Sequence, residues 1–204
     1  MSLAPTRILK DVPDVDRRLA ELGLDRPKLL KVREIALSAA ADATAFHPAN
    51  AAGTFAYQHG TWGLRDSFVG KVWQAARPGG VEVIHNPAIK LMVAYANVDI
   101  ACNDDHSPKP RSRKGAGAER AAMGSLFASL PEYSVQQKAG EMLYYLMVAE
   151  SGAAELSHPI VKESTFVSCI ERIYLSNGDD LERIARSFDD GDVADNFDPI
   201  VIRK

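Results

Sequence analysis

The feature that most constrains the fold is a change in the spacing of apolar residues, which falls roughly 80 residues into the chain. Before that point, apolar residues recur every three or four positions, the period of an amphipathic helix. After it, they alternate with polar or small residues, the period of a strand. Helices first and strands gathered behind them favour the α+β class. We therefore predict an antiparallel β-sheet with the N-terminal helices packed on one face.

Three helices are predicted in the first 76 residues of the chain. Asp14 is placed to cap the first helix and Gly23 to end it. The second helix has Pro27 in its first turn and ends before His47, because a residue that precedes a proline is pushed out of the α region. The third is predicted over residues 61–76, with apolar side chains at steps of four.

Strands are predicted from period-two alternation in the middle and at the end of the chain, over residues 81–85, 89–102, 165–175 and 199–202. Residues 142–148 form a short apolar run that fits a strand, although a buried helix stays open as an alternative. We predict a turn at Glu155–Pro159, an exposed loop over residues 103–117 and a helix over residues 118–130. With no repeat and no low-complexity linker, the chain reads as one domain, residues 1–204.

The composition argues against several classes of partner and compartment. The net charge of −3 and the pI near 6.0 provide no overall attraction to nucleic acid or to anionic membranes. The run Met142–Ala149 is far shorter than the roughly 20 residues of a membrane span, and no signal peptide is evident. Cys102 and Cys169 lie in apolar segments, so we predict buried free thiols. We expect a cytoplasmic protein with no membrane partner.

A basic, glycine-containing segment is the sharpest local feature. Between His106 and Arg120 there are five cations and one acid. Glycines let backbone N–H groups approach an anion, and a helix predicted directly behind them adds a positive dipole end. The spacing of a nucleotide P-loop is missing, and a solvated loop is the alternative interpretation. The candidate binding residues are Lys109, Arg111, Arg113, Lys114, Gly115, Gly117 and Arg120.

Carboxylates and an imidazole come just before this loop, at Asp99, Asp104, Asp105 and His106. Such a set at a strand end is able to hold a divalent metal for phosphate hydrolysis. The competing interpretation is ordinary turn chemistry, since Asp and Asn commonly form turns after strands. None of the established metal motifs accompanies the cluster, so we expect no metal and no cofactor.

The remaining histidines and the acidic segment give weaker signals. His158 follows Ser157, but adjacent residues rarely point at each other, and the GxSxG pattern of a nucleophile elbow is absent. Residues 179–198 carry eight acids and two arginines without calcium-loop spacing. A solvated acidic segment is the expected outcome.

Three functional hypotheses follow from the sequence. The first, which we favour at this point, is a non-enzymatic module that contacts nucleic acid or another polyanion through the basic loop. The second is a homo-oligomeric or protein–protein interaction accessory protein that uses a sheet edge or a helix carrying Trp62 and Trp73. The third is a metal-assisted phosphohydrolase or nuclease built on residues 99–106. The sequence leans against an enzyme, because no catalytic set stands at a recognisable spacing.

Overall fold

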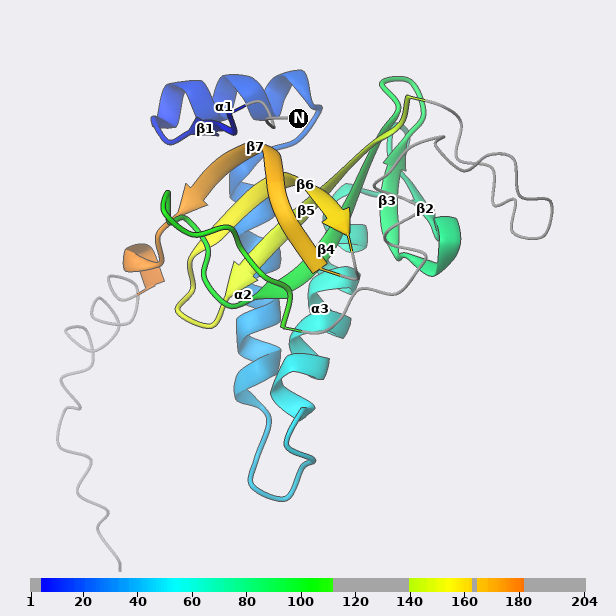
Figure 1. Cartoon of the computed structure of the whole chain (residues 1–204). Helices are drawn as coiled ribbons and strands as arrows, with labels where there is room; N and C mark the ends of the chain where they lie inside the picture. The colour runs from blue at the N-terminus through cyan, green and yellow to red at the C-terminus, as the bar shows by residue number, and fades with distance from the viewer. Residues whose placement is uncertain (1–4, 112–139, 163–164, 182–204) are drawn as a thin grey trace, which may run out of the picture.

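The structure of this chain, a computed structural model, describes residues 5–111, 140–162 and 165–181. In this part of the chain, α-helices combine with a seven-stranded sheet, which confirms the α+β class (Figure 1). The helices are α1 (Val12–Glu21), α2 (Arg26–Ala41) and α3 (Ala51–Phe68). The strands are β1 (Arg7–Leu9), β2 (Gln74–Ala76), β3 (Val83–Asn86), β4 (Leu91–Val98), β5 (Met142–Ala149), β6 (Ala154–Lys162) and β7 (Thr165–Ser176).

The sheet is mixed, so the prediction of a purely antiparallel sheet was wrong. Its strand order is β1-β7-β6-β5-β4-β3-β2, and the pairs β4–β5 and β1–β7 run parallel. Parallel neighbours need a long crossover, and residues 99–141 connect the end of β4 to the start of β5. Strand periodicity is the same in both orientations, so the spacing of apolar residues did not reveal the crossover.

Helix α1 lies close to where the sequence placed it, and α2 begins as predicted but ends at Ala41, several residues before the predicted end at His47. The Asp25 side chain accepts a hydrogen bond from the backbone N–H of Lys28 at 2.9 Å and caps α2. Gly23 has a φ of +67°, the left-handed conformation that ends a helix at low cost. Asp11 rather than Asp14 occupies the N-cap position of α1, where its side chain makes no capping hydrogen bond, and Asp14 lies in the first turn.

The third predicted helix was displaced along the chain. Helix α3 covers residues 51–68 instead of 61–76, and Val69 after it has an extended backbone. Residues 74–76 pair with β3 as an edge strand, so sheet pairing prevailed over the local four-residue spacing. Apart from Phe55 and Tyr57, the early turns of α3 hold alanine, glycine and polar residues, which gave no continuous apolar stripe to detect.

Three further differences concern the strands. The predicted turn at Glu155–Pro159 lies inside β6, where a register shift between His158 and Pro159 accommodates the missing N–H of proline. Residues 142–148 are in β5, a strand, which closes the alternative of a buried helix. Strand β4 ends at Val98, before Cys102, and β1 was not predicted. The helix predicted over 118–130 and the strand over 199–202 lie outside the described residues.

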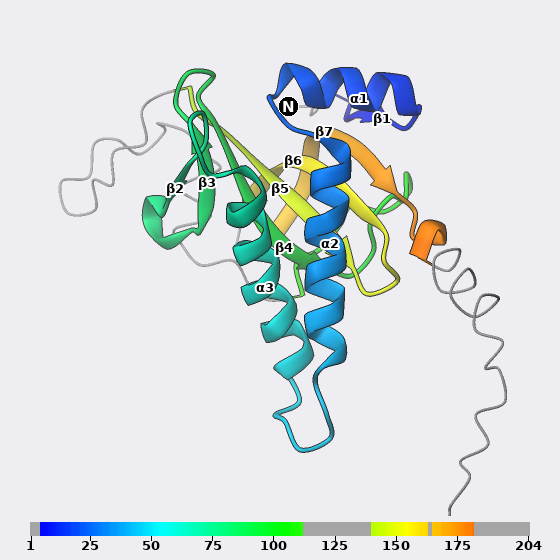
Figure 2. The ribbon, with the colours of Figure 1, turned by 180° about the vertical axis from the view of Figure 1, so that it is seen from behind.

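The core has two parts, one on each face of the central strands. Helices α2 and α3 lie against one face (Figure 2), where Leu29 and Leu64 join the same apolar cluster as Tyr95 and Tyr144. A second cluster on the opposite face includes Met92 and Tyr145. Strands β4 and β5 are therefore buried on both sides, which explains their nearly continuous apolar sequences.

No helix among the described residues has the length and apolar character that crossing a membrane requires. Both cysteines are free. Cys169 is buried in β7, as predicted, whereas Cys102 is half-buried and lies in the loop that follows β4.

Candidate functional site

The loop after β4, residues 99–111, folds back along the end of its own strand. The backbone N–H of Asp99 donates to the carbonyl oxygen of Lys109, and that of Arg111 donates to the carbonyl oxygen of Asn97, both at 3.0 Å. An isolated bridge between Val98 and Pro110 lies between these contacts. The first half of the predicted basic loop is therefore fixed to the sheet by backbone hydrogen bonds.

A buried ion pair between β6 and β7 lies beneath this loop. The Arg172 guanidinium contacts both carboxylate oxygens of Glu155, at 2.9 Å from Nε and 2.7 Å from Nη2. Ser157 Oγ and the backbone N–H of Cys102 donate to the same carboxylate, at 2.7 and 2.6 Å. Both charged side chains are almost completely buried. Burial alone lowers the pKa of Arg172, but its hydrogen bonds and ion pair with Glu155 outweigh burial and raise it.

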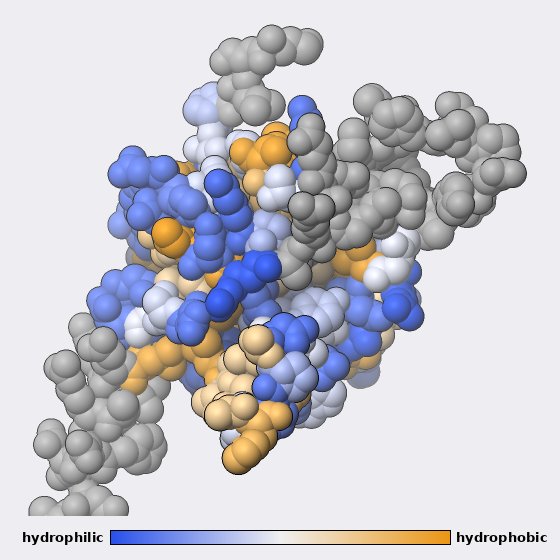
Figure 3. All heavy atoms as spheres, turned by 60° about the horizontal axis from the view of Figure 1, so that its bottom comes forward, coloured by the Kyte–Doolittle hydropathy of each residue, from blue (hydrophilic) through white to orange (hydrophobic). Residues whose placement is uncertain are grey.

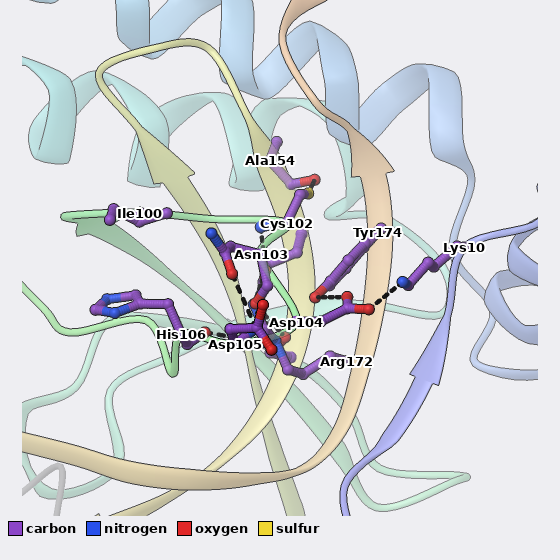
Figure 4. Close-up of polar contacts among 12 residues, drawn as sticks. Lys10, Ile100, Cys102, Asn103, Asp104, Asp105, His106, Ala154, Arg172 and Tyr174 are labelled. Atoms are coloured by element: carbon purple, nitrogen blue, oxygen red, sulfur yellow. Dashed lines mark hydrogen bonds and ion pairs between the residues drawn. The ribbon is translucent and has the colours of Figure 1, made fainter.

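The same arginine also fixes the conformation of the loop. Arg172 Nη1 donates to the backbone carbonyl oxygens of Asn103 at 2.7 Å and of His106 at 3.0 Å (Figure 4). Every donor position that the guanidinium uses is thus directed at Glu155 or at the loop backbone. These bonds use Nε, Nη1 and Nη2 of the guanidinium, so Arg172 acts as a structural anchor for the loop.

Asp104 points away from His106, toward the N-terminal segment. Its carboxylate forms an ion pair with Lys10 and accepts a hydrogen bond from Tyr174 Oη at 3.0 Å (Figure 4). These hydrogen bonds, with Lys10 first, lower the pKa of Asp104. The Arg172 guanidinium lies 5.0 Å from the centre of the Tyr174 ring, a cation–π distance.

Asp99 and His106 form a separate pair on the other side of the loop. His106 Nε2 lies 2.9 Å from Asp99 Oδ2, and Asp99 Oδ1 accepts from the backbone N–H groups of Lys109 and Ile100 at 2.8 and 2.7 Å. Burial raises the pKa of Asp99, but these backbone hydrogen bonds and the His106 contact together lower it by more, so the net shift is downward. Asp99 therefore acts as a turn-forming carboxylate.

The geometry gives the metal-hydrolase hypothesis no support. The cluster that looked compact in sequence is divided between the Asp99–His106 pair and the Asp104–Lys10–Tyr174 set. The Asn103 side chain accepts from the backbone N–H of Asp105 at 2.9 Å, which is a further turn contact. Over residues 5–111, 140–162 and 165–181, no group of three or more His, Cys, Asp or Glu side chains is placed to hold a metal ion.

Only two of the seven candidate polyanion-binding residues lie in the described part of the chain. Lys109 is exposed, and Arg111 Nη1 forms an ion pair with Glu150 at 2.7 Å. Asp99, Asp104 and Asp105 lie in the same segment, so its described half is not strongly basic. The other candidates, Arg113, Lys114, Gly115, Gly117 and Arg120, lie outside the described residues.

A pocket of about 630 Å³ opens between the N-terminal helices and the end of β7. It was not foreseen, because its walls come from segments far apart in sequence. Arg26 uses its guanidinium to bind the carbonyl oxygen of Leu175, at 2.9 and 2.6 Å. The charges that line the pocket are of both signs, and they are Lys10, Asp16, Arg26, Asp179 and Asp180.

Cys102 lines this pocket but is a poor nucleophile. Its Sγ lies 3.1 Å from the carbonyl oxygen of Ala154 and 3.3 Å from that of Ser176, so the S–H donates to backbone. Burial, reinforced by the charge of Glu155, raises the pKa of this thiol to about 12. Because the thiolate is the reactive form of cysteine, this raised pKa and the S–H contacts to backbone disfavour nucleophilic chemistry at Cys102.

The most distinctive surface is the hairpin of α2 and α3, which projects beyond the sheet (Figure 1). At its tip, His47 Nδ1 accepts a hydrogen bond from the backbone N–H of Thr44 at 3.0 Å, and the His47 ring meets the Phe55 ring edge-on at 5.2 Å. Phe46, next to this ordered turn, is fully exposed at 101%. Figure 3, which turns the tip toward the viewer, shows apolar residues gathered there.

The hairpin is also unusual in charge. Residues 43–64 contain no Asp, Glu, Lys or Arg, although a quarter of the whole chain is charged. Trp62 is 56% exposed on the outer side of α3. Trp73, grouped with it in the sequence analysis, lies outside the helix and is buried, and its Nε1 donates to the carbonyl oxygen of Gly23 at 3.1 Å. The absence of charge was visible in the sequence, but only the fold shows that the segment projects.

Comparisons of this chain with protein families, curated proteins and solved structures find no match.

Proposed function

We propose that this chain is a protein-interaction module that binds its partner through the outer face of the α2–α3 hairpin. The observation that carries the proposal is a fully exposed Phe46 on a folded tip, at one end of 22 successive residues without a charge. Surfaces that stay in water usually carry charge, whereas interface cores are depleted of it and enriched in aromatic residues. Residues 43–64 of the hairpin share the low charge of an interface core.

The turn at the tip leaves Phe46 in water, where its ring gains nothing from the core. His47 packs against Phe55 and bonds to Thr44, so the turn is ordered on both sides of the exposed phenylalanine. Burying one such aromatic side chain in a partner stabilises a complex by roughly 1.5–3 kcal/mol. Aromatic anchors of this kind are the residues that most often dominate binding energy.

A protein partner fits this surface better than a membrane does. Segments that bind membrane surfaces usually combine apolar residues with lysines or arginines that attract anionic lipids. The hairpin has no lysine or arginine between residues 43 and 64, and the charge closest to its tip is the acid Asp42. A largely neutral, alanine-rich face is suited to close packing against another protein surface.

The other two hypotheses have less support from the described residues. Asp104 is engaged by Lys10 and Tyr174, and Asp99 by backbone N–H groups. Burial raises the pKa of the Cys102 thiol. Contact between the basic loop and a polyanion stays a prediction, since most of its cations lie outside the described residues. The two free cysteines support placing the module in a reducing compartment such as the cytoplasm.

Photo-crosslinking tests the proposal directly. A benzophenone amino acid is introduced in place of Phe46 in the full chain, and a matched chain carries it in place of Ile170, an exposed apolar residue on β7. We expect a discrete protein adduct from position 46 and none of comparable yield from position 170. Equal yields from the two positions, or no protein adduct from position 46, would show that the hairpin face is not the interaction surface.

A further inference from the structure

We propose that this chain carries a second binding surface, formed by two turns at one end of the sheet, that contacts the surface of an anionic lipid bilayer. The turns are residues 69–73, which follow α3, and residues 87–90, which join β3 to β4. This surface lies at the opposite end of α3 from Phe46, and its role does not depend on that of the hairpin.

Strand pairing brings the two turns to the same end of the sheet. Strands β2 and β3 are antiparallel, with Gln74 opposite His85. The residues just before β2 and just after β3 are therefore neighbours. Figure 2 shows both turns at this end, next to the last turn of α3. They are separated by 13 residues in the sequence, so no local motif joins them.

Both turns have an ordered backbone. In the first, the N–H of Gly70 donates to the carbonyl oxygen of Trp73 at 2.9 Å, and the Trp73 side chain is buried. In the second, Asn86 Oδ1 accepts from the backbone N–H of Ala88 at 3.2 Å. The side chains at the two turns are thus presented from a fixed framework.

The turns expose three aliphatic side chains. Val69 and Val72 on the first turn are 44% and 54% exposed, and Ile89 on the second is 39% exposed. Single exposed apolar residues are common, whereas a group of them marks an interaction site. Turn tips are convex, so a protein partner would have to supply a groove for each. A lipid surface gives way around them and takes up apolar side chains at the boundary between headgroups and acyl chains.

The charge on these segments is positive. Residues 67–81 and 83–98 contain no Asp or Glu, although the chain as a whole has a net charge of −3. Lys71 and Lys90 are exposed, and each follows or precedes an exposed aliphatic residue. No ion pair among the described residues involves either lysine. Exposed aliphatic residues beside free lysines form the combination that binds anionic lipids.

The neighbouring charges leave this combination intact. Lys28 adds a third cation, with Nζ 5.5 Å from the centre of the Phe68 ring, next to Val69. Two acids also flank the turns. Asp66 lies in the last turn of α3, and Glu141 is largely buried with its Oε1 3.3 Å from His85 Nε2.

The expectation of no membrane partner rested on the net charge, which averages over the whole chain. Exposed charges interact only within about 10 Å at physiological salt, so a local group of lysines acts independently of distant acids. Lys71 and Lys90 are 19 residues apart, and only the fold places them at one end. The α2–α3 hairpin, in contrast, has no lysine or arginine between residues 43 and 64.

Vesicle co-sedimentation of the full chain tests the proposal. We expect binding to phosphatidylcholine vesicles that contain about 30% phosphatidylserine, and little binding to pure phosphatidylcholine. Binding should weaken as salt is raised, because salt screens the lysines. The double variant Lys71→Ala/Lys90→Ala should lower the partition coefficient roughly 25-fold, about fivefold for each lysine. The double variant Val72→Ser/Ile89→Ser should lower it roughly tenfold, which corresponds to the loss of about 55 Å² of inserted apolar surface.

The matched controls change the same residue types elsewhere on the surface. Lys109→Ala/Lys162→Ala removes two exposed lysines, and Val167→Ser alters a valine that is 43% exposed. Both should bind like the wild-type chain, and circular dichroism on heating should show that every variant is folded.

Three results would overturn the proposal. The wild-type chain could bind neither kind of vesicle, as expected if these turns contact only a soluble protein. It could bind both kinds equally at low and high salt, so that the lysines play no part. The Lys109/Lys162 variant could lose as much binding as the Lys71/Lys90 variant, which would place the contact elsewhere. Crosslinking at position 46 tests the hairpin separately, so either proposal can fail without the other.

Discussion

Replacing Glu155 by Gln removes one charge from the buried pair and leaves the shape of the side chain almost unchanged. Arg172 then remains a buried cation with no carboxylate. In the wild-type protein, four donor groups converge on the Glu155 carboxylate: two from Arg172, one from Ser157 and one from Cys102. The amide offers one oxygen, so donors directed at its nitrogen lose their acceptor. Breaking a buried pair in this way costs about 3–5 kcal/mol of unfolding free energy.

The assay is urea unfolding followed by circular dichroism at one protein concentration, because self-association would otherwise shift the midpoint. With a slope of about 2 kcal/mol per molar urea, the expected change moves the midpoint down by roughly 1.5–2.5 M. The loop carbonyls of Asn103 and His106 also depend on Arg172. We therefore expect faster amide hydrogen exchange in this loop in the variant.

The matched control is Glu150→Gln, the same substitution at an ion pair with Arg111 that lies on the surface. Glu150 is 80% exposed, and exposed pairs usually contribute less than about 1 kcal/mol. If Glu155→Gln shifts the midpoint no more than Glu150→Gln does, the buried pair does not hold the loop and the anchoring role assigned to Arg172 is wrong.

Three further predictions concern other parts of the chain. A Cβ at Gly60 would lie 2.5 Å from the buried Tyr95 ring, so Gly60→Ala should destabilise the fold by about 1–2 kcal/mol in urea titrations. A Cβ at Gly53 would have 4.0 Å of clearance, so Gly53→Ala should stabilise the fold by up to about 1 kcal/mol. Equal effects of the two substitutions would argue against close packing of α3 on β4. The hydrogen bond from the buried Arg33 lowers the pKa of Asp180 to about 2, below its unfolded value near 4. This pair therefore stabilises the fold above pH 4, and that stabilisation is lost as the pH falls toward 2. Because Asp180 is 40% exposed, the change should be only about 1 kcal/mol, and a pH titration of unfolding that is equally steep in Asp180→Asn would disprove the assignment. The last prediction replaces three cations of the basic loop by alanine, namely Arg111, Arg113 and Lys114. If the loop binds polyanions, retention of the variant on heparin or duplex DNA at low salt should weaken. The slope of log affinity against log salt concentration should also become shallower by about 0.9 for each phosphate that is no longer neutralised. An unchanged slope would show that the loop is only a solvated surface.

Several local elements were predictable from the sequence. Helices α1 and α2 follow from apolar spacing and from Asp25, Pro27 and Gly23, because capping and turn preferences depend on residues near each other in the chain. Strands β5 and β7 follow from their apolar runs and alternation. The errors came where distant pairing decides conformation. Residues 74–76 became a strand because β3 lies beside them, and the segment around Pro159 became one because it pairs with β7.

The same distinction between local and long-range effects applies to the candidate sites. The sequence by itself determined which side chains carry charge, which segment lacks it, and that two cysteines are too few and too isolated to form a disulfide framework. Only the tertiary structure decided that Asp104 and His106 face opposite ways, that Arg172 is directed into its own loop, and that the neutral segment projects with Phe46 exposed. The physical reason is that composition and local propensity act over a few residues, whereas burial and the direction of a side chain depend on segments that are brought together only by packing.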